Sequence, residues 1–197
     1  VTFVTGPADV PPPLGVRVVK VETARQMLDA VQAALPAEAA VFAAAVADWR
    51  VATESNSKIK KDGKTLPQLS FAENPDILAT VSQLGAGRPR LVVGFAAETE
   101  NLVANAQSKL ERKGADLIVA NDVSQAGVGF AHATNAVTLV ARGTEPVEVA
   151  LADRDIDWLT YCAARVMNVR RHVRELYEIL KISNRRISSS VIDVVCK

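Results

Sequence analysis

Four lysines lie close together in residues 58–64, where the sequence reads KIKKDGK. They are Lys58, Lys60, Lys61 and Lys64. Residues 53–57, just ahead of them, are polar and have no helical or strand periodicity, so we expect the lysines on a loop. Ammonium groups clustered in this way suit a polyphosphate ligand. Composition alone favours a basic loop that only faces water, because that is the commoner fate of a run of charges.

A short apolar run, residues 41–46 (VFAAAV), precedes these lysines. It is too short for a free-standing helix and too continuous for a half-exposed strand, so it predicts a central parallel strand. Its alanines favour helix, but small residues would let a ligand lie against the carboxyl end of the strand, where open α/β sheets bind ligands. Asp48 and Trp49 are then expected to face that crevice.

The sequence Asn74-Pro75-Asp76 predicts the start of a helix. Asn74 can act as the N-cap while Pro75 occupies the first helical position. Ile77 and Leu78 follow as part of the buried side of this helix. Its first backbone amides could hold an oxygen-rich ligand.

Two further segments carry polar groups that could reach the same edge of a sheet. Residues 101–114 predict a helix that ends at Gly114, with Lys109 and Lys113 four residues apart on one face. Two such lysines can serve a phosphate site or lie on a wet surface, and the second case is the commoner. After the predicted strand 116–120, Asn121 and Asp122 can bond either a ligand or a turn.

Strands alternating with helices predict an α/β fold with a doubly wound, mostly parallel, Rossmann-like sheet. The predicted strands are 1–5, 16–21, 41–46, 66–71, 90–97 and 116–120, and the helices are 23–35, one from 74, and 101–114. Thr23 is the expected N-cap of the first helix. Residues 135–140 and 147–151 predict an antiparallel hairpin appended to the sheet. Helical spacing resumes at residue 153, and we expect a domain over residues 1–166 and a basic helical tail over 167–197.

Composition matches one globular domain rather than a nucleic-acid or membrane protein. The chain has 197 residues, of which 49% are hydrophobic, and a formal net charge of +1, so attraction for anions has to come from local clusters. No apolar run approaches the length of a spanning helix. Two cysteines and two histidines, far apart, predict neither a disulfide framework nor a zinc site. With no signal peptide expected, the default location is the cytoplasm.

Five short motifs occur together and in order along the chain: AAVADWR at residues 44–50, KIKK at 58–61, NPDIL at 74–78, GFAAET at 94–99 and ANDVS at 120–124. In this combination the chain resembles the phosphopantothenoylcysteine synthetase domain, also called phosphopantothenate-cysteine ligase. The resemblance covers roughly residues 1–165. In bacteria that domain is usually the C-terminal half of a bifunctional coenzyme A biosynthesis protein whose other half is a flavin-dependent decarboxylase.

The resemblance implies an activity and a set of ligands. CTP, with Mg²⁺, activates the carboxylate of phosphopantothenate as an acyl-cytidylate, and the amine of cysteine then displaces CMP. It also implies a homodimer, and FMN only where the decarboxylase half is attached. By the same resemblance Lys58 is the catalytic residue at the transferred phosphate, and backbone near Ala44 and Pro75 reads the base. The implied nucleotide contacts are Ala44, Asp48, Lys58, Pro75, Asp76, Ile77, Leu78, Phe95, Lys109 and Lys113. The role of Asp48 stays open between ribose, magnesium and loop anchor, and no metal ligand is assigned.

The sequence departs from the family pattern in three places. Family members begin with a strand and a glycine- and serine-rich loop, holding an asparagine used in the acyl-cytidylate step, and neither precedes Val1 here. Ala133 stands where an acid is usual, and the tail after Val166 matches nothing in the family. Two functions therefore remain in view: the CTP-dependent ligase, and a non-catalytic module that binds nucleotide or only dimerises.

Overall fold

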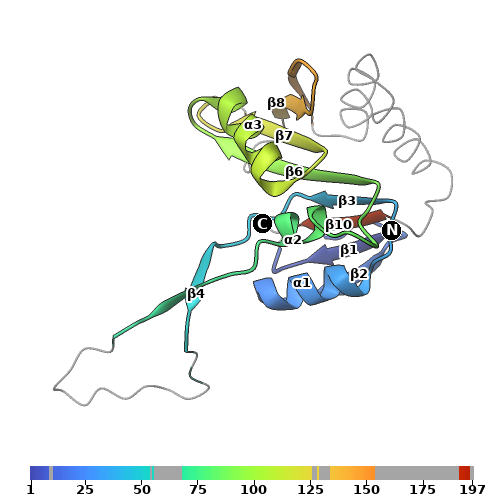
Figure 1. The fold of residues 1–197 in the computed structure, drawn as a ribbon, viewed down its shortest axis with the longest axis vertical. Coiled ribbons are helices and arrows are strands. Elements are labelled where there is room, and N and C mark those ends of the chain that lie inside the picture. Colours follow the sequence, from blue (N-terminus) through green and yellow to red (C-terminus); the bar gives the residue numbers. More distant parts are fainter. Residues whose placement is uncertain are drawn as a thin grey trace.

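An eight-stranded sheet forms the body of the molecule in the computed structural model, which describes residues 1–8, 11–53, 55, 68–125, 128, 134–153 and 191–195 (Figure 1). The strand order is β2-β1-β10-β3-β6-β7-β8-β9. Neighbours from β2 to β7 are parallel, whereas β8 is antiparallel to both β7 and β9. The predicted α/β class with a mostly parallel sheet and an antiparallel hairpin is confirmed. The strands are β1 (Thr2–Thr5), β2 (Arg17–Lys20), β3 (Ala39–Phe42), β6 (Leu91–Glu98), β7 (Leu117–Asp122), β8 (Thr134–Ala141), β9 (Val147–Asp153) and β10 (Val191–Val195).

In the part of the chain that the structure describes, three helices accompany these strands: α1 (Ala24–Ala33), α2 (Ile77–Ser82) and α3 (Leu102–Lys113). Thr23 caps α1 as predicted, through a capping box in which the Gln26 amide donates to the Thr23 hydroxyl and the Gln26 side chain accepts from the Thr23 amide. Gly114 ends α3 with φ 78°, the left-handed conformation that glycine adopts without strain. Local sequence therefore predicted the start of α1 and the end of α3.

The N-cap of α2 was predicted wrongly. Asp76, not Asn74, is the cap, because its carboxylate accepts the Ala79 amide at 2.9 Å, and the helix begins at Ile77. Pro75 consequently lies outside the helix rather than at its first position. Both Asn74 and Asp76 are good capping residues, and only the tertiary contacts of Asn74 decide between them.

The helices α1, α2 and α3 of the described residues all cover one face of the sheet (Figure 1). On β6, Val92 packs in the cluster beneath α1 and α2, and Ala96 packs in the cluster beneath α3. Leu91 and Val93 alternate with them and belong to a separate buried cluster on the opposite face. This alternation follows from the two-residue period of a strand.

The predicted strand over residues 41–46 is displaced toward its N-terminus. β3 ends at Phe42, and residues 43–47 have no regular secondary structure. Residues 43–45 are alanines, which have a lower strand propensity than β-branched residues. The local sequence therefore does not favour continuing the strand beyond Phe42. The result is a backbone segment that leaves the sheet at its carboxyl edge.

A two-stranded arm departs from the body (Figure 1). It consists of β4 (Trp49–Val51) and β5 (Phe71–Glu73), paired antiparallel. The strand predicted over 66–71 is thus shifted: residues 68–70 are not strand, and 66–67 lie outside the described residues. Trp49 was expected at the crevice, but it lies on the arm with 57% of its surface exposed.

The C-terminal part of the chain contains a strand that the sequence did not predict. Residues 191–195, expected in a helical tail, form β10 in the middle of the sheet. The other residues of the predicted tail, and the helix predicted from residue 153, lie outside the described residues apart from Asp153, which ends β9. Among the helices in the described ranges, none is long and apolar enough to cross a membrane.

Candidate functional site

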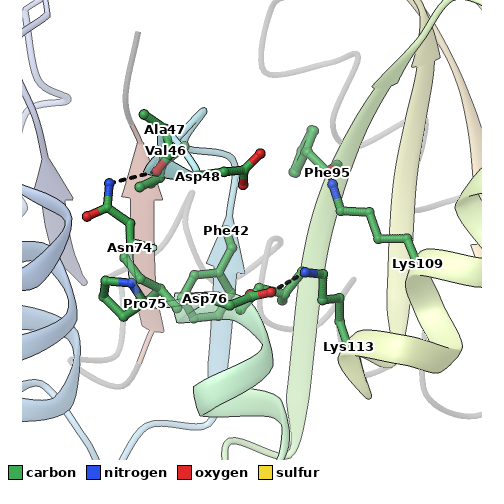
Figure 2. A pocket seen from close by; sticks show the side chains of 13 residues that line it. Phe42, Val46, Ala47, Asp48, Asn74, Pro75, Asp76, Phe95, Lys109 and Lys113 are labelled. Atoms are coloured by element: carbon green, nitrogen blue, oxygen red, sulfur yellow. Dashed lines mark hydrogen bonds and ion pairs between the residues drawn. The ribbon is translucent and has the colours of Figure 1, made fainter. Parts of the chain in front are cut away.

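A cavity of about 170 Å³ lies at the carboxyl edge of the sheet, between the segment after β3, the turn before α2, and α3 (Figure 2). Parallel strands place their carboxyl ends at one edge, and short loops there commonly form ligand sites. The cavity is lined by Phe42, Ala44, Val46, Ala47, Asp48, Asn74, Pro75, Asp76, Ile77, Leu78, Phe95, Lys109 and Lys113.

The structure brings together every nucleotide-contact residue named from the sequence except Lys58. Three stretches of sequence supply them: the segment after β3, the turn into α2, and the pair formed by β6 and α3. Lys58 and its neighbours Lys60, Lys61 and Lys64 lie outside the described residues, as does Ala133. The convergence is observed, and nucleotide binding by these residues stays a prediction.

Four lining residues were missed by sequence reasoning as site residues: Phe42, Val46, Ala47 and Asn74. Phe42 is the last residue of β3, and Val46 and Ala47 lie at the end of and just after the apolar run, in the segment that leaves the sheet early. Asn74 had a signal, since it sits in the NPDIL motif, but it was assigned to a helix cap. Its real contacts are with the opposite wall, which local sequence does not reveal.

Lys109 is held in a half-buried position at the cavity wall. Its ammonium donates a hydrogen bond to the Phe95 carbonyl oxygen at 2.7 Å. Burial lowers the pKa of Lys109, and the charge of Lys113 lowers it further, against the opposing effect of Glu98 and Asp76. An ammonium donates up to three hydrogen bonds, so Lys109 keeps donors for an anionic ligand.

Asp76 and Lys113 form a salt bridge across the cavity wall (Figure 2). One carboxylate oxygen accepts the Ala79 amide, and the other accepts the Lys113 ammonium. Burial by itself would raise the pKa of Asp76, but the hydrogen bonds from Lys113 and Ala79, with the charges of Lys113 and Lys109, lower it below its ordinary value. On this side of the cavity the two lysines exceed the one carboxylate, and the Asp48 carboxylate on the segment after β3 brings the charged side chains of the lining to two of each sign.

Asn74 joins the two backbone segments that flank Asp48. Its side-chain amide donates to the Ala47 carbonyl at 2.8 Å, and its backbone amide donates to the Asp48 carbonyl at 2.8 Å. Arg50 Nη1 donates to the Glu73 carbonyl and, at 3.4 Å, to the Asn74 side-chain oxygen. Among the described residues the Asp48 carboxylate has no hydrogen-bond or ion-pair partner, and Figure 2 shows it directed toward the Phe95 side of the cavity.

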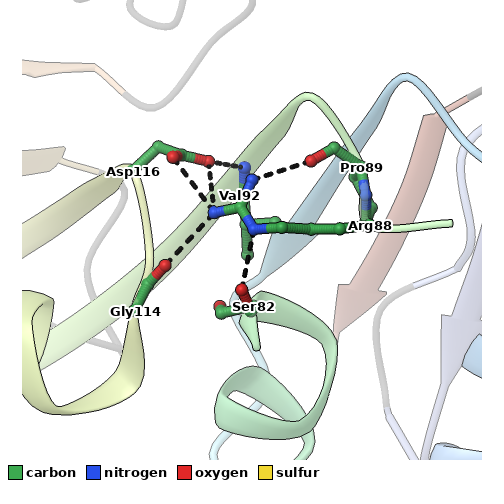
Figure 3. Close-up of polar contacts among 6 residues, drawn as sticks. All are labelled: Ser82, Arg88, Pro89, Val92, Gly114 and Asp116. Atoms are coloured by element: carbon green, nitrogen blue, oxygen red, sulfur yellow. Dashed lines mark hydrogen bonds and ion pairs between the residues drawn. The ribbon is translucent and has the colours of Figure 1, made fainter. Parts of the chain in front are cut away.

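Behind the cavity, Arg88 ties α2 and α3 to the sheet (Figure 3). Its guanidinium donates to the Ser82 carbonyl at 2.7 Å and to the Gly114 carbonyl at 3.1 Å, at the ends of the two helices. It also binds both oxygens of Asp116 at 3.0 Å, and Asp116 accepts the Val92 amide at 2.7 Å. The helices that carry Asp76, Lys109 and Lys113 are therefore held at a set spacing.

The ANDVS motif does not contribute to the cavity. The Asp122 carboxylate accepts hydrogen bonds from the Ser124 hydroxyl at 2.5 Å, from the Gln125 side chain at 3.0 Å and from the Ser124 amide at 3.0 Å, and these bonds lower its pKa. Of the two roles left open for this motif, the structure supports the turn.

A second cavity of about 430 Å³ adjoins the first and shares Val46, Ala47 and Asn74 with it. Its other walls come from the turn after β1, from the start of α1 with Glu22 and Arg25, and from Arg50 of β4. Within the described ranges no group of three or more His, Cys, Asp or Glu side chains could hold a metal ion.

Comparison with known proteins gives consistent matches. The coenzyme A biosynthesis bifunctional protein CoaBC of Vibrio vulnificus (strain YJ016) is 45% identical over 141 residues, which is 71% of this chain and 35% of that protein. CoaBC of Escherichia coli (strain K12) is 46% identical over 142 residues, with the same shares. This chain therefore spans about a third of the length of these relatives.

A solved structure agrees with the fold. The crystal structure of the C-terminal domain of CoaBC superposes with a TM-score of 0.60 at 29% identity, covering 91% of this chain and 74% of that chain. This likeness confirms the Rossmann-like class. The family model of the DNA/pantothenate metabolism flavoprotein C-terminal domain matches residues 1–156, which is most of the chain. The chain thus belongs to the family of the DNA/pantothenate metabolism flavoprotein C-terminal domain.

Proposed function

We propose that the first cavity binds CTP and that this chain is the domain that ligates 4′-phosphopantothenate to cysteine in coenzyme A biosynthesis. One observation carries the proposal: separate sequence motifs, each implied to contact the nucleotide, meet around a single cavity at the carboxyl edge. The names of the relatives, coenzyme A biosynthesis bifunctional proteins, support a place in the same biosynthesis.

The cavity walls suggest how a nucleotide would lie. The base would rest between Ala44 and Phe95, with backbone near Pro75 reading its polar edge, and the phosphates would face Lys109 and Lys113. A volume of about 170 Å³ is below the usual range of roughly 300–1,000 Å³ for ligand pockets, so the triphosphate would extend beyond it. By resemblance, Lys58 would meet the phosphate at which transfer occurs.

The proposed reaction has two steps. A carboxylate oxygen of phosphopantothenate forms a bond to the α-phosphorus of CTP, and the bond to the β-phosphate oxygen breaks, releasing pyrophosphate. The cysteine amine then attacks the activated carbonyl carbon, CMP leaves, and the amine loses a proton. Both steps require that negative charge is neutralised and that the reactants are held in line. Lysines fixed in the cavity wall can neutralise phosphate charge and position the phosphates.

Magnesium would enter with the triphosphate, because this ion is commonly held by one or two carboxylates together with phosphate oxygens. Asp48 fits such a role, since its carboxylate has no partner among the described residues and faces the cavity. The alternative is that the Asp48 carboxylate accepts a hydrogen bond from a ribose hydroxyl. The ion would supply charge neutralisation at the phosphates.

The proposal extends to the assembly in which the domain works. We propose a cytoplasmic homodimer, with a flavin decarboxylase domain and its FMN where the chain is joined to such a half. This part rests on the resemblance and on the bifunctional names of the relatives. Cysteine, phosphopantothenate and CTP are the proposed small-molecule substrates.

Calorimetric titration of this chain with CTP and with ATP, in the presence of Mg²⁺, tests the binding step. We expect weak CTP binding, tighter than that of ATP, because several lysines attract the triphosphate and the turn at Pro75 selects the base. We expect no turnover by the chain alone, since the loop that the resemblance assigns to the acyl-cytidylate is not in its sequence. Absence of CTP binding at low salt, or preference for ATP, would contradict the proposal.

Substitution Lys58→Gln tests catalysis, in the chain extended by the glycine- and serine-rich loop that the resemblance implies. Pyrophosphate release with CTP, Mg²⁺ and phosphopantothenate should be abolished while thermal stability is unchanged, because a loop lysine contributes little to folding. Equal rates for variant and parent would refute the role of Lys58. CTP binding with no pyrophosphate release in the extended parent would favour the non-catalytic module.

A further inference from the structure

Arg88 lies behind the first cavity and does not line it, yet its hydrogen bonds reach the ends of two helices that do (Figure 3). We propose that this arginine is a positioning residue for the charged wall, the side of the cavity formed by Asp76, Lys109 and Lys113. Its guanidinium fixes where these three side chains meet, through contacts with α2, α3 and β6. The effect on CTP binding rests on the proposed function, whereas the effect on the Asp76 carboxyl does not.

One path of contacts runs along α2. Arg88 Nε donates to the carbonyl oxygen of Ser82, the last residue of this helix, at 2.7 Å. Asp76 is the N-cap at the other end of the helix, about 9 Å away along the axis at about 1.5 Å per residue. A helix of this length moves as one rigid piece, so a fixed Ser82 carbonyl also fixes the point from which the Asp76 carboxylate projects.

A second path runs through the end of α3. Arg88 Nη2 donates to the Gly114 carbonyl oxygen at 3.1 Å, and Gly114 directly follows Lys113. The two helix ends lie in contact here, because a Cβ added at Gly114 would be 3.7 Å from Ser82 Cβ. The last carbonyls of both helices carry partial negative charge, which the guanidinium offsets. Lys113 therefore leaves α3 at a point whose distance from α2 depends on Arg88.

Asp116 connects the guanidinium to β6. Both carboxylate oxygens of Asp116 accept Arg88 Nη2 at 3.0 Å, and one also accepts the Val92 amide at 2.7 Å. The Asp116 amide donates in turn to the Val92 carbonyl oxygen at 2.9 Å. β6 continues from Val92 to Phe95, whose carbonyl oxygen accepts the Lys109 ammonium. The position of this ammonium therefore depends on the same group of bonds.

Only an arginine can make this set of bonds. A guanidinium has five donors in a rigid planar fork, whereas lysine has three donors on one flexible end. Nε, Nη1 and Nη2 of Arg88 each bind a different backbone carbonyl, those of Ser82, Pro89 and Gly114. One ammonium cannot reach all these points together. Arg88→Lys therefore keeps the positive charge and removes the geometry, which separates positioning from long-range attraction.

The pKa of Asp76 reports the geometry of the charged wall without any nucleotide. Lys109, Lys113 and Asp48 are the other charged side chains of this cavity. Burial raises the pKa of Asp76, but the hydrogen bond from Lys113, the cap hydrogen bond and the charges of both lysines lower it below its ordinary value. Arg88→Lys should raise this pKa towards the ordinary value in the folded chain. Carbon-13 NMR of the side-chain carboxyls, assigned with Asp76→Asn, measures it.

Two controls separate positioning from a general loss of stability. Arg90→Lys makes the same change two residues along, at an exposed arginine that pairs with Glu38 at 3.5 Å, and should leave the pKa of Asp76 unchanged. Val149→Ala shortens a buried side chain of β9 on the other face of the sheet, so it should lower the melting temperature without changing that pKa. An unchanged pKa of Asp76 in Arg88→Lys would overturn the inference.

Asp116→Asn is a milder second variant of the same contact. It keeps the shape of the side chain and removes one of the two carboxylate oxygens that bind Arg88. The pKa of Asp76 should move in the same direction as in Arg88→Lys, by a smaller amount. This variant supplies the measurement if Arg88→Lys does not fold, and absence of any shift in it would then overturn the inference.

A double-mutant cycle tests whether Arg88 acts through the ion pair. Lys113→Met removes the ammonium and by itself should raise the pKa of Asp76. In that background Arg88→Lys should add little, because the ion pair that it would displace is already gone. Fully additive shifts would mean that Arg88 acts on Asp76 independently of Lys113, which contradicts the proposed path through α3.

CTP titration extends the test to the proposed function. At a temperature where every variant is folded, Arg88→Lys should weaken CTP binding about tenfold, since coupling through packed elements commonly has this size. Arg90→Lys and Val149→Ala should bind CTP as the parent does. Equal CTP affinity of Arg88→Lys and a parent that binds CTP would overturn the inference. A parent that binds no CTP, while Arg88→Lys still raises the pKa of Asp76, would count against the proposed function alone.

Discussion

At the scale of single residues, Lys109 is the group whose chemistry depends most on its surroundings. Folding lowers its pKa through burial and the nearby charge of Lys113. The folded chain therefore binds fewer protons than the unfolded chain between the lowered and the ordinary pKa, and this group makes stability rise with pH across that interval. A bound anion would reverse the shift, because opposite charge favours the ammonium form.

Proton uptake on CTP binding follows from this reversal. At alkaline pH we expect CTP to bind with uptake of protons, and its affinity to fall as pH rises through the lowered pKa of Lys109. Calorimetry in buffers of different ionisation enthalpy measures the uptake. Lys109→Ala should remove it, while Arg142→Ala, which removes an exposed cation in the turn between β8 and β9 that has no part in the Lys109 shift, should leave it intact. Uptake that persists in Lys109→Ala would contradict the assignment.

Asp76 has two separable tasks, as the cap of α2 and as the partner of Lys113. Asp76→Ala should lower the free energy of unfolding by about 1 kcal/mol, the usual cost of losing an N-cap, whereas Asp76→Ser keeps a capping oxygen and should recover most of it. Denaturant unfolding measures both variants.

The dependence of the free energy of unfolding on pH in the acidic range separates the ion pair of Asp76 from its role as helix cap. Because folding lowers the pKa of Asp76, its contribution is present above the ordinary carboxyl pKa and is lost as pH falls through the lowered one. That part of the pH dependence should be absent from both variants, since neither carries the carboxylate. If the free energy of unfolding of Asp76→Ser depends on acidic pH as that of the parent does, the ion pair with Lys113 contributes nothing to stability.

At the scale of elements, the contact between α2 and β6 sets the depth of the cavity. A Cβ added at Gly94 would lie 2.6 Å from Leu78 Cδ2 and 2.9 Å from Ile118 Cδ1, closer than atoms can approach. Leu78 lines the cavity, and Gly94 precedes the lining residue Phe95. Glycine is therefore required at position 94, because any side chain there would collide with the side chains packed against the strand.

Gly94→Ala should therefore destabilise the chain by about 1–3 kcal/mol, the usual range for overpacking a core, and should weaken CTP binding by displacing Leu78. Gly85→Ala is the matched control, because a Cβ there meets nothing within 4 Å. Thermal melts and CTP titrations of the two variants provide the comparison. Equal stability of Gly94→Ala and Gly85→Ala would contradict the close packing of α2 on β6.

At the scale of the whole molecule, the attraction for a polyphosphate has to be local. The net charge of +1 supplies no long-range field, and the cavity lining carries Lys109 and Lys113 together with the carboxylates of Asp76 and Asp48. Attraction for phosphate therefore has to come from the two ammonium groups on α3 at short range. Partly exposed charges are screened over a Debye length of about 8 Å at physiological ionic strength. The strength of CTP binding should thus depend on salt.

Raising the salt from about 0.01 M to about 0.15 M shortens the Debye length from about 30 to about 8 Å and should weaken CTP binding progressively. Cytidine is the matched ligand, since it has the same base and ribose without phosphate charge. Its affinity, measured by the same titration, should change little. A salt effect of equal size on cytidine and CTP would indicate that the lysines do not contact the phosphates.

The sequence by itself determined the features whose causes are local. The apolar runs predicted β1, β2, β6 and β7, and the Thr23 and Gly114 signals predicted the ends of α1 and α3. The segments 135–140 and 147–151 also predicted the hairpin of β8 and β9. The resemblance of the motifs to a family implied most of the residues that line the cavity. It did so even at the turn before α2, where the N-cap was predicted wrongly.

Tertiary structure alone decided which segments meet. Asp76 rather than Asn74 caps α2 because Asn74 is engaged with the Ala47 and Asp48 carbonyls, a contact across the cavity. The predicted strand over residues 41–46 ends early, at Phe42, and β10 enters the centre of the sheet, because strand pairing is a long-range interaction that periodicity does not encode. Local patterns describe what a segment can form, and the partner across the sheet decides where it lies.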